Sequence, residues 1–359
     1  MKKELKKELK ERVKLRASVV AHRISKMRSG EGRVTAEVIV MLKERGAEVE
    51  VRTLSKPEAD PGVKVDYVLP FHISKFDKYQ RILVWFSASR SRPDFFLNTS
   101  GVPIPLSGIA THFIYAGAPA LSSAPSKYRG LWALYLLPFR ILLRKFREEA
   151  RKAKIIANSF YSAKGIKEVY GVDPHVIYPP VEVEFFLRAF HYEGQGYFVT
   201  VGRFERGKML ENAVEVAARS RLRGVIIGSL GERGYLNSLR RMARDRGANL
   251  QFLPDLPQEE MLEVIRGASA YFHPTLGEHF GIPVVEAMAA GLVPVVPQES
   301  GAYEVIPEYS YSTLEEAAEM LKAAIGEGKE MREEVKRRAL YFSPSKFRRR
   351  LWRRIEYSL

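Results

Sequence analysis

The fold of this chain is decided by one segment, His273-Pro274-Thr275-Leu276-Gly277-Glu278-His279-Phe280-Gly281-Ile282-Pro283-Val284-Val285-Glu286-Ala287-Met288-Ala289-Ala290-Gly291. The pattern predicts a strand that ends at His273, a turn that contains glycine, and then an Ala-rich helix. Such a helix start offers an anion free backbone N–H groups and the positive end of the helix dipole. Two carboxylates, Glu278 and Glu286, flank the turn, and carboxylates accept hydrogen bonds from polyols. The segment therefore predicts a site for a diphosphate that lies between a ribose and a hexose.

Length and composition indicate a soluble two-domain protein. A chain of 359 residues is too long for one ordinary core, and its length suits two domains with a cleft between them. The sequence has no run of about 20 apolar residues, and residues 1–8 lack the apolar stretch of a signal peptide. We therefore expect a cytoplasmic protein, peripheral to the cytoplasmic membrane face. The absence of cysteine excludes disulfides and thiolate chemistry, and the scarcity of Asn and Gln is typical of heat-adapted proteins.

Positive charge is concentrated in the first half of the chain. The net charge is +16, and residues 1–195 hold 34 Lys and Arg against 20 Asp and Glu. The first domain is therefore expected to meet an anionic partner. No helix-turn-helix, zinc-finger spacing or aromatic stacking motif accompanies the charge, so we expect no nucleic-acid partner. An anionic membrane surface fits the charge better.

The order of predicted elements indicates two α/β domains with parallel sheets. In the first half, a strand at 17–24, a turn at Gly30 and Gly32, a helix at 34–45 and a strand at 49–54 form a βαβ unit. Further strands are expected at 94–98, 111–115, 154–158 and 175–178. After a polar connection at 186–196, a second series of strands is expected at 197–201, 224–227, 249–253, 270–273 and 293–296. A last helix is expected at 345–357.

The segment 273–291 resembles the Glu-x7-Glu signature of retaining glycosyltransferases with the GT-B fold, a large nucleotide-sugar family of the group 1, or family 4, type. Three further matches follow the family's order: Ser29-Gly30-Glu31-Gly32-Arg33, Ala157-Asn158-Ser159 with Tyr178-Pro179-Pro180-Val181, and Val201-Gly202-Arg203-Phe204-Glu205-Arg206-Gly207-Lys208. The resemblance implies two Rossmann-like domains that face each other across a cleft. It predicts an acceptor domain at 1–190, a donor domain at 196–340 and a basic helix at 341–359 that crosses back to the first domain.

The resemblance also assigns roles at the site. Glu278 is expected to position the donor sugar, Glu286 to bind ribose, and His112 to orient the hexose or to stabilise developing charge. Donor binding is expected from Gly30, Gly202, Arg203, Lys208, Glu278, Phe280, Gly281, Ile282 and Glu286, and catalysis from Glu278, His112, Arg203 and Lys208. From the residues alone, Gly30 also suits a tight turn without a ligand, and His112 a structural histidine.

Stabilisation of the leaving diphosphate requires cations. The sequence has no Asp-x-Asp pair to hold a divalent metal, so side chains must supply the charge, and we expect no metal and no cofactor. Arg203 and Lys208, five positions apart after a strand, match the family's diphosphate-binding pair, although two solvated charges would give the same pattern. The resemblance implies retention of the anomeric configuration, with the leaving phosphate oxygen taking the acceptor proton. The two glutamates are not a hydrolase acid–nucleophile pair.

Two segments that are both basic and apolar give information about the kind of acceptor. Residues 130–147 and 346–354 combine large apolar side chains with Lys and Arg, which suits either a membrane interface or helices packed inside the protein. Glu278-His279-Phe280-Gly281-Ile282 most resembles the α-1,2-mannosyltransferases of lipid-linked oligosaccharide assembly. The resemblance favours GDP-mannose over a UDP-sugar, with the base near 228–231 and 252–255, and a glycan acceptor linked to polyprenyl phosphate.

Two other functions remain open. The same fold would serve a UDP-sugar-dependent enzyme with a soluble acceptor, as in sucrose, glycogen or trehalose synthesis. A basic membrane- or nucleic-acid-binding module with a relic nucleotide pocket is the alternative that is not an enzyme.

Overall fold

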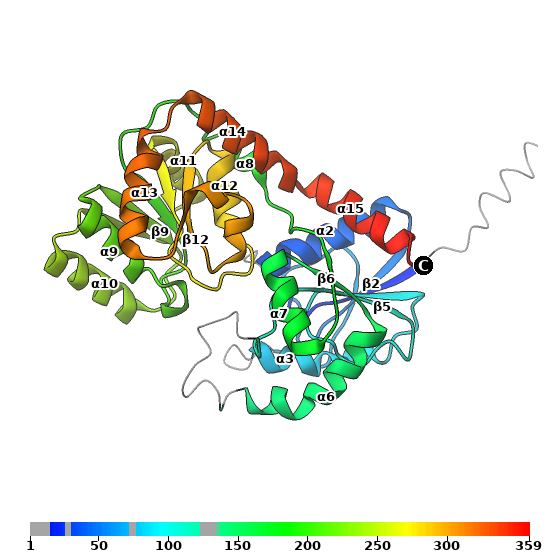
Figure 1. The fold of residues 1–359 in the computed structure, drawn as a ribbon. Helices are drawn as coiled ribbons and strands as arrows, with labels where there is room; N and C mark the ends of the chain where they lie inside the picture. The colour runs from blue at the N-terminus through cyan, green and yellow to red at the C-terminus, as the bar shows by residue number, and fades with distance from the viewer. Residues whose placement is uncertain (1–14, 26–29, 72–76, 123–133, 135) are drawn as a thin grey trace, which may run out of the picture.

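The computed structural model describes residues 15–359 except 26–29, 72–76, 123–133 and 135 (Figure 1). The basic leader, Ser29 and much of the first half of the apolar segment 130–147 lie outside the described residues.

The first half of the chain forms a parallel sheet of seven strands in the order β3-β2-β1-β4-β5-β6-β7. Its strands are β1 (Arg16–Val20), β2 (Glu48–Arg52), β3 (Lys64–Asp66), β4 (Phe95–Asn98), β5 (Thr111–Ala116), β6 (Lys154–Ala157) and β7 (His175–Val176). The central strands β4 and β5 are buried almost throughout because helices cover both faces of the sheet. The strand order reverses between β1 and β4, and ligands of such sheets bind at this switch point, beyond the carboxyl ends of the strands.

Among the described residues of the first half, the helices are α2 (Gly30–Glu44), α3 (Asp77–Leu83), α4 (Trp85–Ala88), α6 (Leu137–Lys152) and α7 (Phe160–Tyr170). The predicted turn at Gly30 and Gly32 is wrong, because α2 already begins at Gly30. Glu31 explains the early start: its carboxylate lies in the first turn, where an acid is favourable, and pairs with His22 and Arg81.

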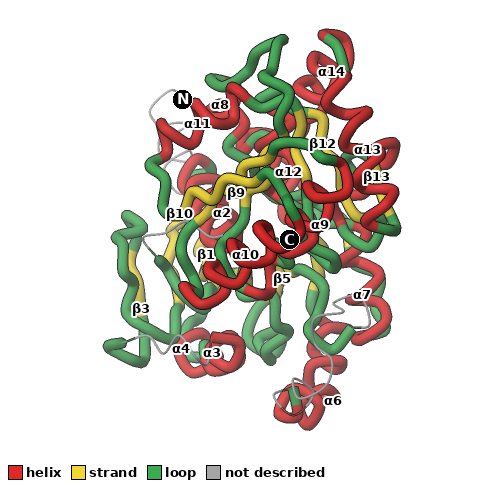
Figure 2. Tube along the Cα trace, turned by 90° about the vertical axis from the view of Figure 1, so that its left-hand side faces the viewer, coloured by secondary structure: helices red, strands yellow, loops and turns green. Residues whose placement is uncertain are grey.

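The second half forms a parallel sheet of six strands in the order β10-β9-β8-β11-β12-β13. Its strands are β8 (Phe198–Val201), β9 (Gly224–Gly228), β10 (Leu250–Pro254), β11 (Ala270–Phe272), β12 (Val293–Pro297) and β13 (Ser310–Tyr311). The α-helices are α8 (Val183–Leu187), α9 (Glu211–Ser220), α10 (Arg233–Arg246), α11 (Gln258–Gly267), α12 (Ile282–Ala289), α13 (Leu314–Gly326) and α14 (Lys329–Ala339). Short 3₁₀ turns are η2 (Arg206–Lys208), η3 (Gly301–Glu304), η4 (Pro307–Tyr309) and η5 (Leu340–Phe342). Both halves are thus the predicted Rossmann-like layers, with strands inside and helices outside (Figure 2).

The last helix, α15 (Pro344–Glu356), returns to the first half (Figure 1). Its buried residues Phe347, Leu351 and Ile355 join the core beneath α2, and Arg348 pairs with Glu37 of that helix. The apolar side chains of the basic tail therefore pack inside the protein.

The connection between the two halves is packed. Val183, Phe186 and Ala189 are buried with the core of the second half, although residues up to 190 were expected to belong to the first domain. Packing against the second half therefore starts earlier in the chain than the expected boundary.

Candidate active site

A cation and a carboxylate meet where the loops after β8 and β11 come together. Lys208 ends η2, just after β8, and its Nζ lies 2.8 Å from Oε2 of Glu278 in the loop between β11 and α12. Thr275 ties the two loops by donating a hydrogen bond of 3.0 Å to the Lys208 carbonyl. Burial alone would raise the pKa of Glu278, but the Lys208 ammonium, aided by His273, holds that pKa well below its usual range. Glu278 is therefore a charged acceptor, and Lys208 is the cation fixed beside it.

The start of α12 requires glycine. Gly281, the residue before the helix, has φ of +90°, in the left-handed region that favours glycine, and a Cβ there would lie 3.0 Å from the Ala302 side chain. The preceding Phe280 is buried, with its ring 5.5 Å from Tyr178 and 5.4 Å from Phe342 between centroids. The side chain of Phe280 is thus a packing anchor, and only its backbone remains for donor binding.

Glu286, on the second turn of α12, pairs with the first half of the chain. Its Oε1 accepts a hydrogen bond of 2.5 Å from Arg33 of α2. Burial raises the pKa of Glu286 above its ordinary value, and the guanidinium of Arg33 only partly offsets this effect. One turn earlier, a Cβ on Gly30 would approach Cδ1 of Ile282 to 3.0 Å, so the two helix starts are in close contact. Gly30 therefore allows the two halves to approach each other.

Further contacts hold the two halves together beside Glu278. Ser159 caps the start of α7 and donates a 2.5 Å hydrogen bond to the carbonyl of His279. The His279 ring lies against Gly117, just beyond the carboxyl end of β5, where a Cβ would come within 2.3 Å of its Nδ1. Glu304 of η3 accepts hydrogen bonds from the amides of Phe160 and Tyr161 at 3.0 and 2.6 Å. The site residues thus lie at the junction of the two halves.

The structure does not bring Arg203 to the two glutamates. Its side chain is 60% exposed and lies 3.3 Å from Glu205, a residue of the same loop. The neighbouring Gly202 has its carbonyl so close to Gly228 that a Cβ on Gly228 would lie 1.9 Å away. The requirement for glycine therefore falls on Gly228, while a Cβ on Gly202 itself would meet only ordinary contacts.

His112 lies at the wrong end of its strand for the predicted role. His112 was expected to orient the hexose, but it is the second residue of β5 and lies far from the carboxyl end of that strand. The side chain is fully buried, with Nδ1 2.6 Å from Glu149 of α6 and Nε2 3.3 Å from Asn98. Burial lowers the pKa of His112, although Glu149 opposes the shift. The predicted strand at 111–115 agrees with β5, but the expected role of His112 does not fit its position: the residue lies near the amino-terminal end of β5 and is part of the core.

Two residues of the site were not singled out from the sequence. Arg33 is the last residue of the motif Ser29-Gly30-Glu31-Gly32-Arg33, and a cation one turn into a helix at that position was a signal for a role in the site. His273 ends the strand before Glu278 and is buried; burial lowers its pKa to about 4, with Glu278 opposing this shift and Lys208 adding to it. Its Nε2 has no hydrogen-bond partner among the described residues. A histidine directly before proline in the signature segment was the available signal.

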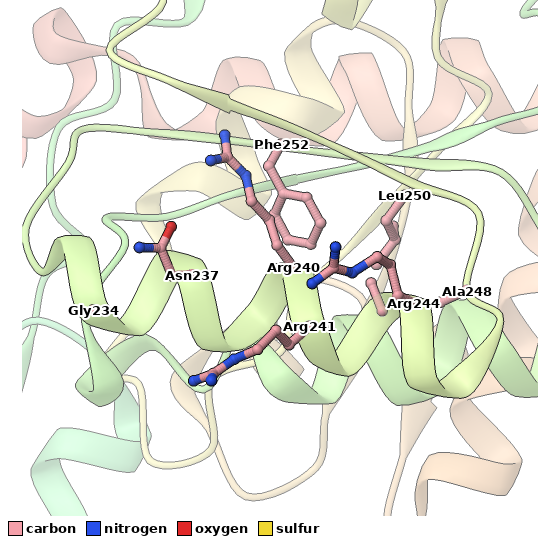
Figure 3. Close-up of a pocket in the computed structure, with 9 residues that line it drawn as sticks. Gly234, Asn237, Arg240, Arg241, Arg244, Ala248, Leu250 and Phe252 are labelled. Carbon is pink, nitrogen blue, oxygen red and sulfur yellow. The ribbon is translucent and has the colours of Figure 1, made fainter.

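A separate hollow lies on the outer side of the second half (Figure 3). It has a volume of about 750 Å³ and runs along α10 and the edge strand β10. Its lining includes Arg240, Arg241, Arg244, Leu250 and Phe252. Of the residues expected to contact the donor, only Phe252, in the segment 252–255 expected near the base, lines this hollow.

The junction of the two halves presents fixed positive charge to an anion. Within the described ranges, no three His, Asp or Glu side chains gather in a way that could hold a metal ion. The charges available are Lys208 and Arg33, next to the amino-terminal ends of α2 and α12. Fixed cations and helix starts stabilise a departing anion without reorganisation.

These features, two Rossmann-like sheets with a helix start, a cation and two acids at their junction, define a nucleotide-sugar transferase of the GT-B fold. Residues 28–185 match the profile of Glycosyltransferase Family 4, and residues 184–340 match that of Glycosyl transferases group 1. The chain belongs to this glycosyltransferase family, whose members transfer a sugar from a nucleotide-sugar donor.

Curated relatives match only part of the chain. The human "GDP-Man:Man(3)GlcNAc(2)-PP-Dol alpha-1,2-mannosyltransferase" is 29% identical over 168 residues, which cover 41% of this chain and 34% of that protein. The D-inositol 3-phosphate glycosyltransferase of Rhodococcus erythropolis is 29% identical over 179 residues, covering 44% of this chain and 40% of that protein. The match thus spans between a third and two fifths of these relatives' length.

Solved structures match the whole fold. The Anabaena protein HepE in complex with UDP has a TM-score of 0.70 at 14% identity, covering 97% of this chain and 100% of that one. Sucrose-phosphate synthase from Thermosynechococcus elongatus has a TM-score of 0.70 at 14% identity, covering 96% and 100%. These matches confirm the predicted GT-B fold. In the part of the chain that the structure describes, we find no helix with the length and apolar character needed to span a membrane.

Proposed function

We propose that the protein is a retaining, metal-independent hexosyltransferase that moves mannose from GDP-mannose onto a lipid-linked glycan. The observation that carries the proposal is the Lys208–Glu278 pair, 2.8 Å apart, with Glu278 in the loop that leads into α12, the helix that carries Glu286. The name of the human relative describes a GDP-mannose-dependent transfer to a dolichol-linked glycan, which supports this choice of donor and acceptor.

In the proposed reaction, negative charge develops on the diphosphate as its bond to the anomeric carbon breaks. The Lys208 ammonium and the amides at the start of α12 stabilise this charge. Glu278, kept ionised by Lys208, holds the hydroxyls of the hexose and so fixes the orientation of the reacting carbon. Glu286 accepts hydrogen bonds from the ribose. The leaving phosphate oxygen takes the acceptor proton, and the sugar keeps its anomeric configuration. His112 has no part in these steps, because it is enclosed in the first core.

The exposed face of the first half supports a membrane-bound acceptor. In α6, Phe139 and Phe146 face inward while Leu137 and Ile141 are exposed, Ile141 by 72%. The same helix carries exposed Arg140, Arg144 and Lys145. Trp85 and Phe86 of α4 add two further exposed aromatic rings in the first half of the chain. Apolar side chains mixed with cations suit the surface of an anionic bilayer.

A donor screen tests the reaction. The chain is incubated with GDP-mannose and with UDP-sugars, with and without polyprenyl-phosphate-linked glycan, and release of the nucleoside diphosphate is followed. We expect release that depends on GDP-mannose and on the lipid-linked acceptor. Faster release of the nucleoside diphosphate with a UDP-sugar and a soluble acceptor would contradict both the proposed donor and the proposed acceptor. Nucleotide binding without any release would indicate a relic pocket.

Flotation with vesicles tests the surface. Vesicles that contain anionic phospholipid should carry the wild-type chain upward at low salt. The double variant Leu137→Ser and Ile141→Ser should remain at the bottom, while Arg221→Gln, a change of charge in the second half, should still float. Equal flotation of all three proteins would exclude α6 as the contact.

A further inference from the structure

The amino-terminal turns of two helices from opposite halves meet at the proposed donor site. At the first residues of α2 and α12, Gly30 and Ile282 are so close that a Cβ on the glycine would lie 3.0 Å from Cδ1 of the isoleucine. One turn further along both helices, Arg33 donates to Glu286 at 2.5 Å. The positive ends of both helix dipoles therefore point toward the same region, where a diphosphate would be stabilised.

Arg33 is largely enclosed at this junction. Its side chain is mostly buried, and it lies beside two acids, Glu286 and Glu182 of the connection between the halves. Burial alone would lower the pKa of Arg33, but the two carboxylates outweigh it and raise the pKa, so the guanidinium stays charged. A charged group in this position needs an anionic partner at every stage of the reaction.

The Arg33 guanidinium and the ribose hydroxyls would compete for the same carboxylate, that of Glu286. Under the proposed function, Glu286 accepts hydrogen bonds from the ribose, yet in this structure it accepts one from Arg33. Because Glu286 is buried, little room remains around its oxygens for a second set of donors. A ribose that takes Glu286 displaces the guanidinium, which keeps only the longer-range attraction of Glu182, and the diphosphate that arrives with the ribose is the new anion it can bind. Guanidinium groups bind phosphate through paired N–H donors.

We propose that Arg33 is a donor-responsive residue: it holds Glu286 while the site is free and passes to the diphosphate when the nucleotide sugar binds. This inference rests on the proposed function, since it requires a nucleotide at Glu286. Arg33 thus belongs to the donor site although it lies in the first half of the chain. The exchange links occupancy of the donor site to the contact between α2 and α12.

The exchange predicts opposite effects on two kinds of ligand. A nucleoside has the ribose but no diphosphate, so it must displace Arg33 without giving it a new partner. A nucleoside diphosphate supplies that partner. Removing the guanidinium should therefore weaken binding of GDP or UDP, but leave binding of guanosine or uridine unchanged or make it tighter.

The test is calorimetric titration of GDP, UDP, guanosine and uridine into the wild type and Arg33→Gln, in mildly alkaline buffer that keeps Glu286 ionised. We expect the variant to lose at least about tenfold in affinity for the better diphosphate, the typical effect of one charge-assisted hydrogen bond. Its affinity for the matching nucleoside should not fall. Arg16→Gln is the matched control, because it removes one positive charge at the start of β1, the end of the sheet opposite the site. It should change neither affinity by more than about twofold, as expected for an exposed charge.

Other outcomes would overturn the inference. An equal loss for both ligands in Arg33→Gln would mean that Arg33 only supports Glu286, and an equal gain would mean that it only blocks the site. Arg33→Lys keeps the charge without the paired donors and should lose diphosphate affinity selectively, which preserves the test if the glutamine variant unfolds. If the wild type binds no nucleotide, the proposed function fails as well; if it binds and the two ligands respond alike, the inference alone fails.

Discussion

Replacing Lys208 with methionine tests the role of the cation in the proposed reaction. The Lys208 ammonium lies 2.8 Å from Glu278, and the two side chains are 29% and 22% exposed, so the charge is held in a partly desolvated site. One electrostatic contact to a developing oxyanion typically contributes about 3 to 4 kcal/mol, or a hundredfold or more in rate. We therefore expect Lys208→Met to lower turnover by at least about a hundredfold.

The same substitution should change the pH dependence of the remaining activity. In the wild type, Lys208 holds the pKa of Glu278 well below its usual range, so Glu278 stays ionised over the working range. Without the ammonium, burial raises that pKa with less opposition. The residual activity of the variant should therefore decline on acidification at a higher pH than the activity of the wild type.

The assay is release of nucleoside diphosphate at saturating donor, with thermal unfolding measured in parallel. Arg206→Gln is the control: Arg206 belongs to the same 3₁₀ turn as Lys208, but its side chain is exposed to solvent. It should retain nearly full turnover. A Lys208→Met enzyme within about threefold of the wild type would remove Lys208 from the mechanism, given the size of such contacts.

Three further predictions concern the fold and the chemistry. Gly281→Ala should destabilise the protein by about 1 to 3 kcal/mol, seen as a lower melting temperature, because the left-handed backbone and the Ala302 side chain both oppose a Cβ; an unchanged melting temperature would contradict the assigned φ. Burial displaces the pKa of His273 from 6.5 to about 4, so the unfolded chain binds the proton first and stability is lost as pH falls through this window. Urea unfolding of His273→Asn should therefore show a smaller loss of stability between neutral pH and about pH 4, by up to about 3 kcal/mol, and an unaltered loss would refute this. Transfer activity should survive EDTA, because Lys208 supplies the positive charge; complete loss that magnesium or manganese restores would show that a metal is needed.

Much of the fold follows from the sequence because its signals are local. Apolar strands alternate with amphipathic helices, and this order alone predicts two parallel sheets with their ligand edges at the carboxyl ends of the strands. The helix start at Gly281 was also predictable, since a glycine directly before an Ala-rich helix marks a backbone turn. The expected element bounds differ from the structure by a few residues, where hydrogen bonding rather than apolar pattern sets the strand end.

What the sequence did not predict depends on contacts between distant residues. Arg33 and Glu286 are 253 positions apart, and no local pattern signals that they meet. His112 belongs to a segment that was correctly predicted as a strand, but its environment depends on Glu149, which contacts it from a helix 37 positions later. Arg203 has the family's spacing, yet its side chain is exposed to solvent and pairs with Glu205.

The most direct test of the account is a structure of the protein with GDP or UDP bound. We predict that the diphosphate lies beside the Lys208 ammonium, between the amino-terminal turns of α2 and α12, with the ribose at Glu286. A nucleotide bound elsewhere, for example in the arginine-lined hollow along α10, with Lys208 still paired only to Glu278, would contradict it.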